Sequence, residues 1–509
     1  MSTPPETSIV ESGSIAPAFP PTAGNTRGKD AGVSHIKRVL PWLVATSFFM
    51  ESLDMTILNT AVPTVAAALG VAPLSLKTAL TSYTLSLALF IPLSGWMADR
   101  FGTRRVFFAA ILVFTIGSLL CGLAVNIPML IASRIVQGVG GAMMMPVGRI
   151  AIVRTFPKAE ILQAMSFVVI PGLIGPLMGP LAGGAIVNWL HWRAIFFINI
   201  PIGLAGLWAV HLYMPDYRSR HPRPFDLRGF LLFGGGVALL SHALEVFGEH
   251  DTPSVGIAAM LALASALIAL YLRHAFRHAH PMLPLALFRH RTFAAAVGGG
   301  FISRIGLGGM PFLLPLYYQV GLGYSPLHAA LLIVPQPLAA MTCKLVITRI
   351  LMRVSYRQAL AGNAVLIGLV MASFATVTAA TSTWVILAMA FIFGFLMSAQ
   401  YTSLNTLAFA DLSAAETSTG SSLASVGQQL SMSFGVAIAS LLTALFLATW
   451  QGSAPGSAPA MSAAIRCAFV ALGGLSVFSS VSFLALRHGD GAEVLEHASL
   501  QTKSAARAH

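Results

Sequence analysis

The segment Gly175-Pro-Leu-Met-Gly179-Pro-Leu-Ala-Gly183-Gly184 lies inside an apolar run of about 25 residues, which is long enough to cross a lipid bilayer. Together with Gly172, its glycines recur at steps of three and four residues, so four of them share one face of a helix. That face carries no side chains, and a neighbouring backbone can therefore approach it closely. The prolines between the glycines each remove a backbone donor and favour a bend. The segment thus predicts a membrane helix with a close-packing face.

The composition of the whole chain agrees with this prediction. Hydrophobic residues make up 56% of the 509 residues, charged residues make up only 9%, and the mean hydropathy is +0.79. A soluble protein of this length would carry roughly a quarter charged residues. The net charge of +13 resembles that of a nucleic-acid binder, but the basic residues lie between apolar stretches instead of in one patch. The chain is therefore predicted to be an all-α polytopic membrane protein without a nucleic-acid partner.

Fourteen apolar stretches are expected to span the membrane, in a pattern of six, two and six. They run near residues 39–61, 76–97, 105–124, 128–150, 161–186, 194–214, 228–247, 254–274, 292–319, 327–349, 358–378, 383–406, 417–448 and 464–486. The expected boundaries are a disordered tail at 1–38, an N-terminal six-helix bundle at 39–214, basic linkers with two extra helices at 215–291, a C-terminal six-helix bundle at 292–486 and a tail at 487–509.

The basic residues predict the orientation of the chain. If the N-terminus is cytoplasmic, 23 of the 30 Lys and Arg residues fall on the cytoplasmic side, and only Lys77, Arg193 and Arg466 fall outside. Cytoplasmic loops of membrane proteins carry such an excess of Lys and Arg. We therefore expect a multi-pass protein of the bacterial cytoplasmic (inner) membrane with both termini in the cytoplasm.

The loop after the second stretch reads Gly95-Trp-Met-Ala-Asp99-Arg100-Phe-Gly102-Thr-Arg104-Arg105. It resembles the signature cytoplasmic loop of the major facilitator superfamily, from which Met97 and Thr103 depart. Thr103 replaces a usual cation, which removes one partner for a salt bridge. The physical interpretation is a gate latch, in which Asp99 at a helix end accepts hydrogen bonds from helix N-terminal amides or from arginine and Gly102 permits a tight turn. The alternative is a basic loop that only orients the chain.

The glycine segment also resembles a motif of this superfamily, G-x-x-x-G-P-x-x-G-G, which lies on the fifth helix and marks exporters. The residues assigned to this antiporter motif are Gly175, Pro176, Gly179, Pro180, Gly183 and Gly184. The resemblance implies a major facilitator fold, with two six-helix bundles around a central cavity and two additional helices between them. It also implies alternating access by rocking of the two halves, without a bound cofactor.

Two further segments place charges inside expected spans. Glu51-Ser-Leu-Asp54-Met-Thr-Ile-Leu-Asn59 resembles a motif of the fourteen-span drug:proton antiporter family, and Arg134-Ile-Val-Gln137 resembles the proton-coupling motif of the superfamily. A rise of about 1.5 Å per residue puts Asp54 and Arg134 at a similar depth in the bilayer. Charges inside a membrane are costly, so these residues are expected to serve a function. The two motifs and the similar depth imply that Asp54, Glu51 and Arg134 couple transport to protons. The alternative is a purely structural polar cluster.

A substrate cavity is expected between the two bundles. Arg304 has no acidic partner within the spans of its own half, where Asp411 and Glu416 lie in a loop. It either binds backbone carbonyls or snorkels towards the membrane surface, or it faces the cavity and there meets Glu51, Asp54 or an anionic substrate group. The candidate cavity residues are Glu51, Asn59, Gln137, Arg304, Tyr317, Gln336, Gln400, Tyr401 and Asn405. The uncharged members also fit packed hydrogen-bonding roles.

Neither a metal site nor a cofactor is expected. The segment 273–291 holds several histidines between Arg and Pro residues, and no acidic residue is near in the sequence. We therefore predict a solvated basic loop there. The chain contains no phosphate-binding loop or nucleophile motif. Cys121, Cys343 and Cys467 fall in apolar stretches and are predicted to be buried thiols.

Together these motifs predict a proton-coupled antiporter, not an enzyme, that exports small amphipathic or toxic organic molecules. An uptake symporter on the same fold and a receptor or scaffold without transport are the alternatives. The glycine motif argues against the symporter, and the intramembrane charges argue against the scaffold. The expected partners are protons, a small-molecule substrate and the lipid bilayer. A periplasmic adaptor and an outer-membrane channel are further candidates that the sequence does not show.

Overall fold

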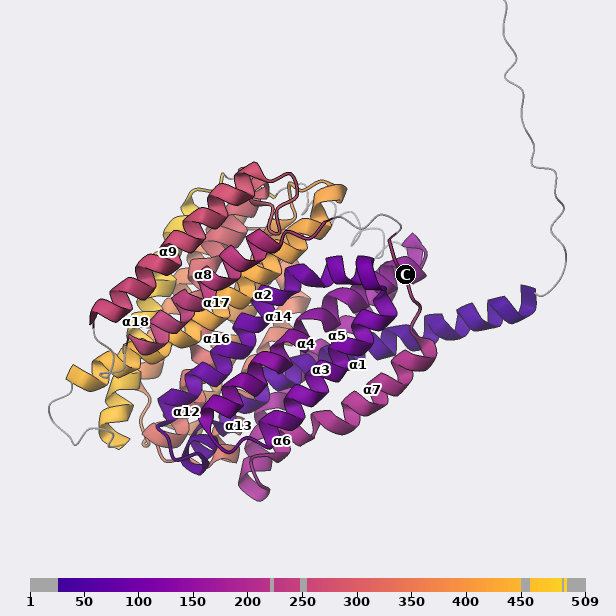
Figure 1. The fold of residues 1–509 in the computed structure, drawn as a ribbon. Helices are drawn as coiled ribbons and strands as arrows, with labels where there is room; N and C mark the ends of the chain where they lie inside the picture. Colours follow the sequence, from indigo (N-terminus) through magenta and orange to yellow (C-terminus); the bar gives the residue numbers. More distant parts are fainter. Residues whose placement is uncertain (1–25, 220–223, 248–253, 450–457, 488, 492–509) are drawn as a thin grey trace, which may run out of the picture.

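The computed structural model describes residues 26–219, 224–247, 254–449, 458–487 and 489–491, and these residues form helices and connecting turns without any strand (Figure 1). Helices satisfy their backbone N–H and C=O groups internally, as a bilayer requires. The all-helical prediction is confirmed.

The N-terminal bundle forms from the first seven α-helices among the described residues. They are α1 (Thr26–Ala68), α2 (Lys77–Phe101), α3 (Thr103–Gly122), α4 (Ile127–Thr155), α5 (Lys158–Trp189), α6 (Ala194–Phe197) and α7 (Asn199–Tyr213), with the short 3-10 helix η1 (Pro73–Leu76) before α2. The two additional helices follow as α8 (Leu227–Val246) and α9 (Ser254–Arg277).

The C-terminal bundle is more interrupted. Its elements are η2 (Leu285–Arg289), α10 (Arg291–Phe293), η3 (Ala294–Gly299), α11 (Gly300–Gly308), α12 (Met310–Leu316), η4 (Tyr317–Gly321), α13 (Pro326–Ile333), α14 (Pro335–Leu351), α15 (Tyr356–Ser373), η5 (Phe374–Thr376), α16 (Thr383–Ala408), α17 (Ala414–Thr449) and α18 (Ala458–Leu484). The expected span at 292–319 is one continuous stretch in which η3 and η4 are π-helical turns.

Polar side chains mark where several spans begin. Asn126 before α4 and Ser325 before α13 each accept a hydrogen bond from the backbone N–H three residues later. Asp226 does the same at the start of α8. Such caps satisfy N–H groups that have no partner within the helix, so these span boundaries follow from local sequence.

Thirteen helical stretches among the described residues are long and apolar enough to cross a membrane, and each matches one of the fourteen expected spans. The fourteenth, α1, does not reach the same mean hydropathy because it carries Glu51, Asp54 and Asn59. It nevertheless packs along the whole bundle against α5. The polar residues that lower its hydropathy are the ones on which the site depends.

The two halves meet where α2 packs on α17 and α5 packs on α13. Gln319 Nε2 donates to the carbonyl of Thr60 at 2.8 Å across this boundary. Helices α8 and α9 lie side by side along one edge of the molecule, and α8 contacts both α2 and α17 (Figure 1). Glu245 of α8 stabilises the contact with α2. Its carbonyl accepts a hydrogen bond from Lys77 Nζ at 2.8 Å, and its carboxylate accepts one from the Thr81 hydroxyl.

One expectation about the thiols is wrong. Cys121 and Cys343 are buried, but Cys467 is exposed on α18. The outer faces of membrane helices are apolar too, as exposed Trp208, Trp384 and Val255 illustrate. An apolar neighbourhood in the sequence therefore does not predict burial within the protein.

Candidate functional site

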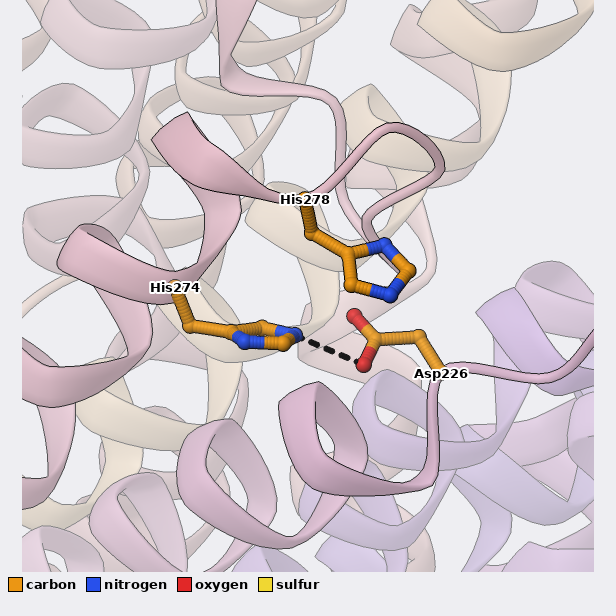
Figure 2. Close-up of side chains that lie close together, drawn as sticks. All are labelled: Asp226, His274 and His278. Atoms are coloured by element: carbon orange, nitrogen blue, oxygen red, sulfur yellow. Dashed lines mark hydrogen bonds and ion pairs between the residues drawn. The ribbon is translucent and has the colours of Figure 1, made fainter.

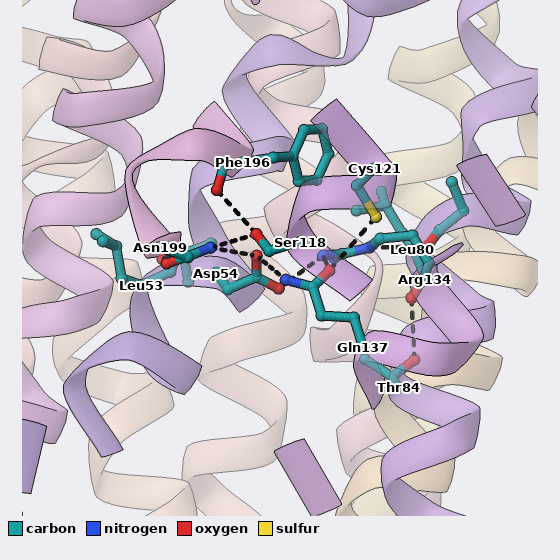
Figure 3. A network of polar contacts seen from close by, with 12 residues as sticks. Leu53, Asp54, Leu80, Thr84, Ser118, Cys121, Arg134, Gln137, Phe196 and Asn199 are labelled. Atoms are coloured by element: carbon teal, nitrogen blue, oxygen red, sulfur yellow. Dashed lines mark hydrogen bonds and ion pairs between the residues drawn. The ribbon is translucent and has the colours of Figure 1, made fainter. Parts of the chain in front are cut away.

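Asp54 of α1 and Arg134 of α4 form an ion pair inside the N-terminal bundle (Figure 3). Arg134 Nη1 lies 2.6 Å from Asp54 Oδ2, and the two side chains are 1% and 0% exposed. The similar depth that the sequence predicts for these residues is thus realised as direct contact. The pair is shielded from solvent on every side.

Two amides complete the coordination of the Asp54 carboxylate. Gln137 Nε2 donates to Asp54 Oδ1 at 2.8 Å, while Gln137 Oε1 accepts from Arg134 Nη1 at 2.9 Å. Asn199 Nδ2 donates to the same Oδ1 at 3.2 Å and to Ser118 Oγ at 3.0 Å. The structure therefore adds Asn199 and Ser118 to the predicted site. A polar residue in the otherwise apolar Ile198-Asn199-Ile200 was the signal for Asn199.

Arg134 also contacts a backbone carbonyl and two aromatic rings. Its Nε donates to the carbonyl of Ala79 at 3.4 Å. The guanidinium lies 4.3 Å from the ring centre of Tyr83 and 5.9 Å from that of Phe196. Aromatic faces attract guanidinium groups, most strongly where water is absent. The arginine therefore has partners besides Asp54.

Glu51 lies one helical turn from Asp54 on α1 and is 7% exposed. Its Oε2 is buried and has no hydrogen-bond partner among the described residues. The first helix thus presents two carboxyl groups in different situations. One is balanced by an arginine and two amides, and the other keeps a free oxygen for a proton or a ligand.

The glycine face of α5 packs directly on this same helix α1. A Cβ atom added at Gly175 would lie 2.6 Å from Ser52 Cβ. At Gly179 it would overlap Thr56, and at Gly183 it would overlap the carbonyl of Ile57. The predicted close-packing face therefore exists, and it sets the position of the helix that carries Asp54.

The end of the same motif reaches the other half of the molecule. A Cβ atom at Gly184 would lie 2.7 Å from Ala330 Cβ and 2.8 Å from the carbonyl of Pro326, both in α13. The carbonyl of Pro180 accepts a hydrogen bond from the Thr60 hydroxyl at 3.4 Å. Helix α5 therefore connects the buried pair to the boundary between the halves.

Arg304 of α11 is the buried arginine of the C-terminal half, at 2% exposed. Its Nη2 donates to Asn405 Oδ1 at 3.0 Å, and its guanidinium lies 5.6 Å from the ring centre of Tyr401. Among the described residues it makes no ion pair, and its Nε has no hydrogen-bond partner. The sequence expectation that Arg304 has no acidic partner in its half agrees with this environment.

The other candidate cavity residues differ in their surroundings. Gln400 is fully buried, accepts from Asn363 Nδ2 at 2.8 Å and donates to Ser303 Oγ at 3.4 Å. Tyr317 is also buried and donates its hydroxyl to the carbonyl of Val377. These two residues lie in the packing of the C-terminal half rather than on an open surface.

Most of the remaining cavity candidates lie in more open positions. Asn405 is exposed, and Tyr401 and Asn59 are partly exposed. Gln336 is buried, but its Nε2 has no partner within the described part of the chain. These residues can therefore still contact a ligand.

The loop between α2 and α3 contacts two other segments of the protein. Asp99 Oδ1 accepts from Arg154 Nη2 of α4 at 2.8 Å. Gly102 has a φ of 98°, which favours glycine, and a Cβ atom there would overlap Asp216. Gly95 is half-buried, and Arg100 and Arg105 are exposed. Arg154 was not among the predicted latch residues.

Thr103, one of the two departures from the family pattern, makes its own contacts. It is buried, its hydroxyl donates to the carbonyl of Pro215 at 2.9 Å, and it accepts from Tyr217 N at 2.9 Å. The neighbouring Arg104 N donates to Asp216 Oδ1 at 3.3 Å, and its guanidinium donates to the carbonyl of His211. A threonine here therefore replaces a salt bridge with hydrogen bonds to the linker that begins after α7.

The expectation for the histidine segment needs a correction. An acidic residue does lie near it in space, because Asp226 Oδ1 is 2.8 Å from His274 Nε2 (Figure 2). Burial alone would raise the pKa of Asp226, but hydrogen bonds from Gly229 N, His274 and Met282 N hold that pKa below its usual value. Sequence distance hid this neighbour, since 48 residues separate Asp226 from His274.

Comparisons with known proteins agree with this architecture. The family model of the Major Facilitator Superfamily matches residues 44–436. Relatives named "Putative multidrug resistance protein MdtD" include one from Serratia proteamaculans (strain 568), 42% identical over 80% of this chain and 85% of its own length. Another, from Salmonella heidelberg (strain SL476), is 43% identical over 80% of this chain and 86% of its own length.

Solved structures share the fold at low sequence identity. A bacterial homologue of the human lysosomal transporter Spinster has a TM-score of 0.61 and 18% identity, over 88% of this chain and 96% of its own. A D-xylose–proton symporter has a TM-score of 0.61 and 14% identity, over 89% of this chain and 98% of its own. The all-helical fold, the family match and these relatives together establish that this chain is a multi-pass membrane transporter of the major facilitator superfamily.

Proposed function

We propose that this protein is a proton-coupled antiporter that exports small organic molecules across a bacterial inner membrane. The observation that carries the proposal is the buried Asp54–Arg134 pair with Gln137 bridging both side chains. Desolvated charges in a membrane are costly, and such residues commonly mark proton relays and substrate pathways.

When the ion pair opens, the arginine keeps other hydrogen-bond partners. A proton that binds Asp54 Oδ2 takes the place of the guanidinium and neutralises the carboxylate. Gln137 Oε1 and the carbonyl of Ala79 then still accept from Arg134, and Tyr83 still lies against its face. Loss of the proton restores the ion pair. The group therefore has two hydrogen-bonded states, an ion pair and a protonated form with a net charge of +1, between which a proton cycle can alternate.

The surroundings of α1 link these states to alternating access. Helix α1 packs on α5 through the glycine face, and α5 in turn packs on α13 of the other half. A shift of α1 when the pair opens would therefore reach the boundary between the halves. Rocking of two halves about a central site is the general mode of such transporters.

Export, rather than uptake, is supported by the antiporter motif on α5 and by the relatives, whose printed names describe multidrug resistance. The substrates would be small amphipathic molecules. Glu51 of the N-terminal half offers a site for cationic groups, and Arg304 of the C-terminal half offers one for anionic groups. Zwitterionic and anionic compounds therefore belong in the test panel. The termini and the linker at 215–228 would lie in the cytoplasm.

The proposal is tested in inverted membrane vesicles with an acidic interior. Addition of an exported compound to the outside should collapse the preset proton gradient in the wild type. Asp54→Asn should abolish this collapse while still binding the compound, because an amide and a carboxyl group have similar shapes. Glu160→Gln, which removes an exposed ion pair with Lys37, is the matched control and should behave as wild type.

A second measurement separates the candidates for the proton site. Purified wild-type protein in detergent should release protons when the substrate binds. If Asp54→Asn releases as many protons with the same pH dependence, Asp54 is not the coupling site, and Glu51→Gln becomes the decisive variant. A compound that collapses the gradient only when loaded inside the vesicles would instead indicate an uptake symporter.

A further inference from the structure

A cluster of potential metal ligands lies where the two additional helices meet. Asp226 precedes α8, His274 lies in the last turn of α9, and His278 follows that turn (Figure 2). The ligand atoms of all three lie within 4.8 Å of one another, and the two imidazole centres are 4.9 Å apart. The backbone continues the helical hydrogen bond from His278 N to the carbonyl of His274, so the two rings share one face.

We propose that Asp226, His274 and His278 bind a transition-metal ion, with Zn²⁺ the best fit. Two imidazole nitrogens and one carboxylate oxygen form a donor set that Zn²⁺ takes, and histidines four residues apart on a helix commonly supply two of its ligands. Water would occupy the fourth position, since His278 lies at the surface. This site is independent of the proposed transport cycle.

The carboxylate is already oriented for this role. Its side chain is 3% exposed, Oδ1 accepts from Gly229 N at 2.9 Å, and Oδ2 accepts from Met282 N at 3.1 Å. Hydrogen bonds to a ligating carboxylate fix its direction, as outer-shell partners do in metal sites. One ligand of the three is therefore held before any ion arrives.

Only small adjustments are needed to admit an ion. Tetrahedral Zn²⁺ with bonds of roughly 2.0–2.1 Å holds neighbouring ligand atoms about 3.3 Å apart. His274 Nε2 and Asp226 Oδ1 are now 2.8 Å apart, so they would separate slightly. His278 Nδ1 accepts from His280 N at 3.2 Å, and metal ligation would replace this exposed hydrogen bond.

The nearby charges select among cations. Arg228, Arg273 and Arg277 lie next to the ligands in the sequence and oppose any cation held by electrostatics alone. Mg²⁺ and Ca²⁺ depend on several oxygen ligands, of which the cluster supplies one carboxylate. An ion that forms strong bonds to imidazole can overcome this repulsion. The bound ion would tie the start of α8 to the end of α9.

The test is a Zn²⁺ titration of the full-length protein in detergent, purified without a polyhistidine tag and competed against a chromogenic chelator. Wild type should bind one Zn²⁺ at this site. His278→Ala should weaken this binding at least about tenfold. Asp226→Asn should do the same without unfolding α8, because asparagine caps a helix as well as aspartate.

His280→Ala is the matched control, since it removes an exposed histidine of the same loop that lies outside the cluster. It should leave the Zn²⁺ affinity unchanged. Equal affinity of His278→Ala and wild type would overturn the proposal, as would an equal loss in His280→Ala and His278→Ala. Because no substrate or proton gradient is present, this result does not depend on whether the protein is an antiporter.

Discussion

The two halves of this transporter each bury an arginine, but the two arginines have different partners. Arg134 in the N-terminal half contacts a carboxylate and two polar amide or carbonyl oxygens. Arg304 in the C-terminal half contacts one amide and an aromatic ring. Within the described C-terminal bundle, the ion pairs Arg291–Asp490 and His290–Glu416 lie at the rim instead.

This difference separates two uses of a buried cation. An arginine with an internal carboxylate can exchange that partner for a proton, so it suits coupling. An arginine with a free donor and no internal carboxylate still lacks an anion, so it suits recognition of a ligand. We therefore propose proton chemistry for one half and substrate chemistry for the other.

The largest expected effect comes from breaking the pair on one side only. Arg134→Leu leaves Asp54 buried and unpaired, and we expect it to lower the free energy of unfolding by about 3–5 kcal/mol. Arg304→Leu should cost less, because it strands no carboxylate. Chemical denaturation in detergent measures both. The double variant Asp54→Asn/Arg134→Leu should recover part of the loss, and equal losses for the two single arginine variants would contradict the comparison.

The next effect concerns the packing that places Asp54. Gly179→Leu should push α5 away from α1, with an overpacking cost of about 1–3 kcal/mol. We expect it to block export while the protein still inserts into the membrane. Gly474→Leu is the control, because a Cβ atom there meets nothing within 4 Å and the residue is exposed. Normal export by a normally expressed Gly179→Leu variant would show that this contact is dispensable.

A third variant sharpens the role of Arg304. Arg304→Gln should reduce the kcat/KM for anionic substrates by about tenfold, the loss expected for one charged hydrogen bond of roughly 1.5 kcal/mol. Cationic compounds of similar size should be exported as before. Vesicle uptake of both classes provides the measurement, and Arg304→Lys should retain part of the anion preference. A parallel decline for cations would mean that Arg304 supports the fold alone.

The smallest effect is expected at the rim of the C-terminal half. Burial alone would raise the pKa of Asp490, but hydrogen bonds from Arg291 and Arg487 N hold that pKa below its usual value. This carboxylate therefore stabilises the fold above its unfolded pKa of about 3.9, and the contribution is lost as the pH falls through the lower folded pKa.

Asp490→Asn should accordingly lower the free energy of unfolding at neutral pH by no more than about 1 kcal/mol. The thermal midpoint should fall slightly as a result. The difference in thermal midpoint between the variant and the wild type should become smaller as the solution is acidified below about pH 4. Thermal scans over that range measure it. A gap that widens on acidification would contradict the sign of this linkage.

Several of these features follow from the amino-acid sequence alone. Thirteen of the expected spans coincide with helices that are long and apolar enough to cross a membrane, because hydropathy and helix caps are local properties. The similar level of Asp54 and Arg134, which allows their contact, could be predicted from the expected span edges and the helical rise. The glycine spacing likewise determined which face of α5 could pack closely.

Partners that come from distant segments required the tertiary structure. The sequence could not assign Asn199 to Asp54, 145 positions away, or Arg154 to Asp99, 55 positions away. It also predicted a solvated loop for the histidines at the end of α9 and missed their acidic neighbour. Asp226 comes close to these histidines only when α8 packs on α9. Helix periodicity determines which residues share a face, but the packing of one helix on another decides what that face meets.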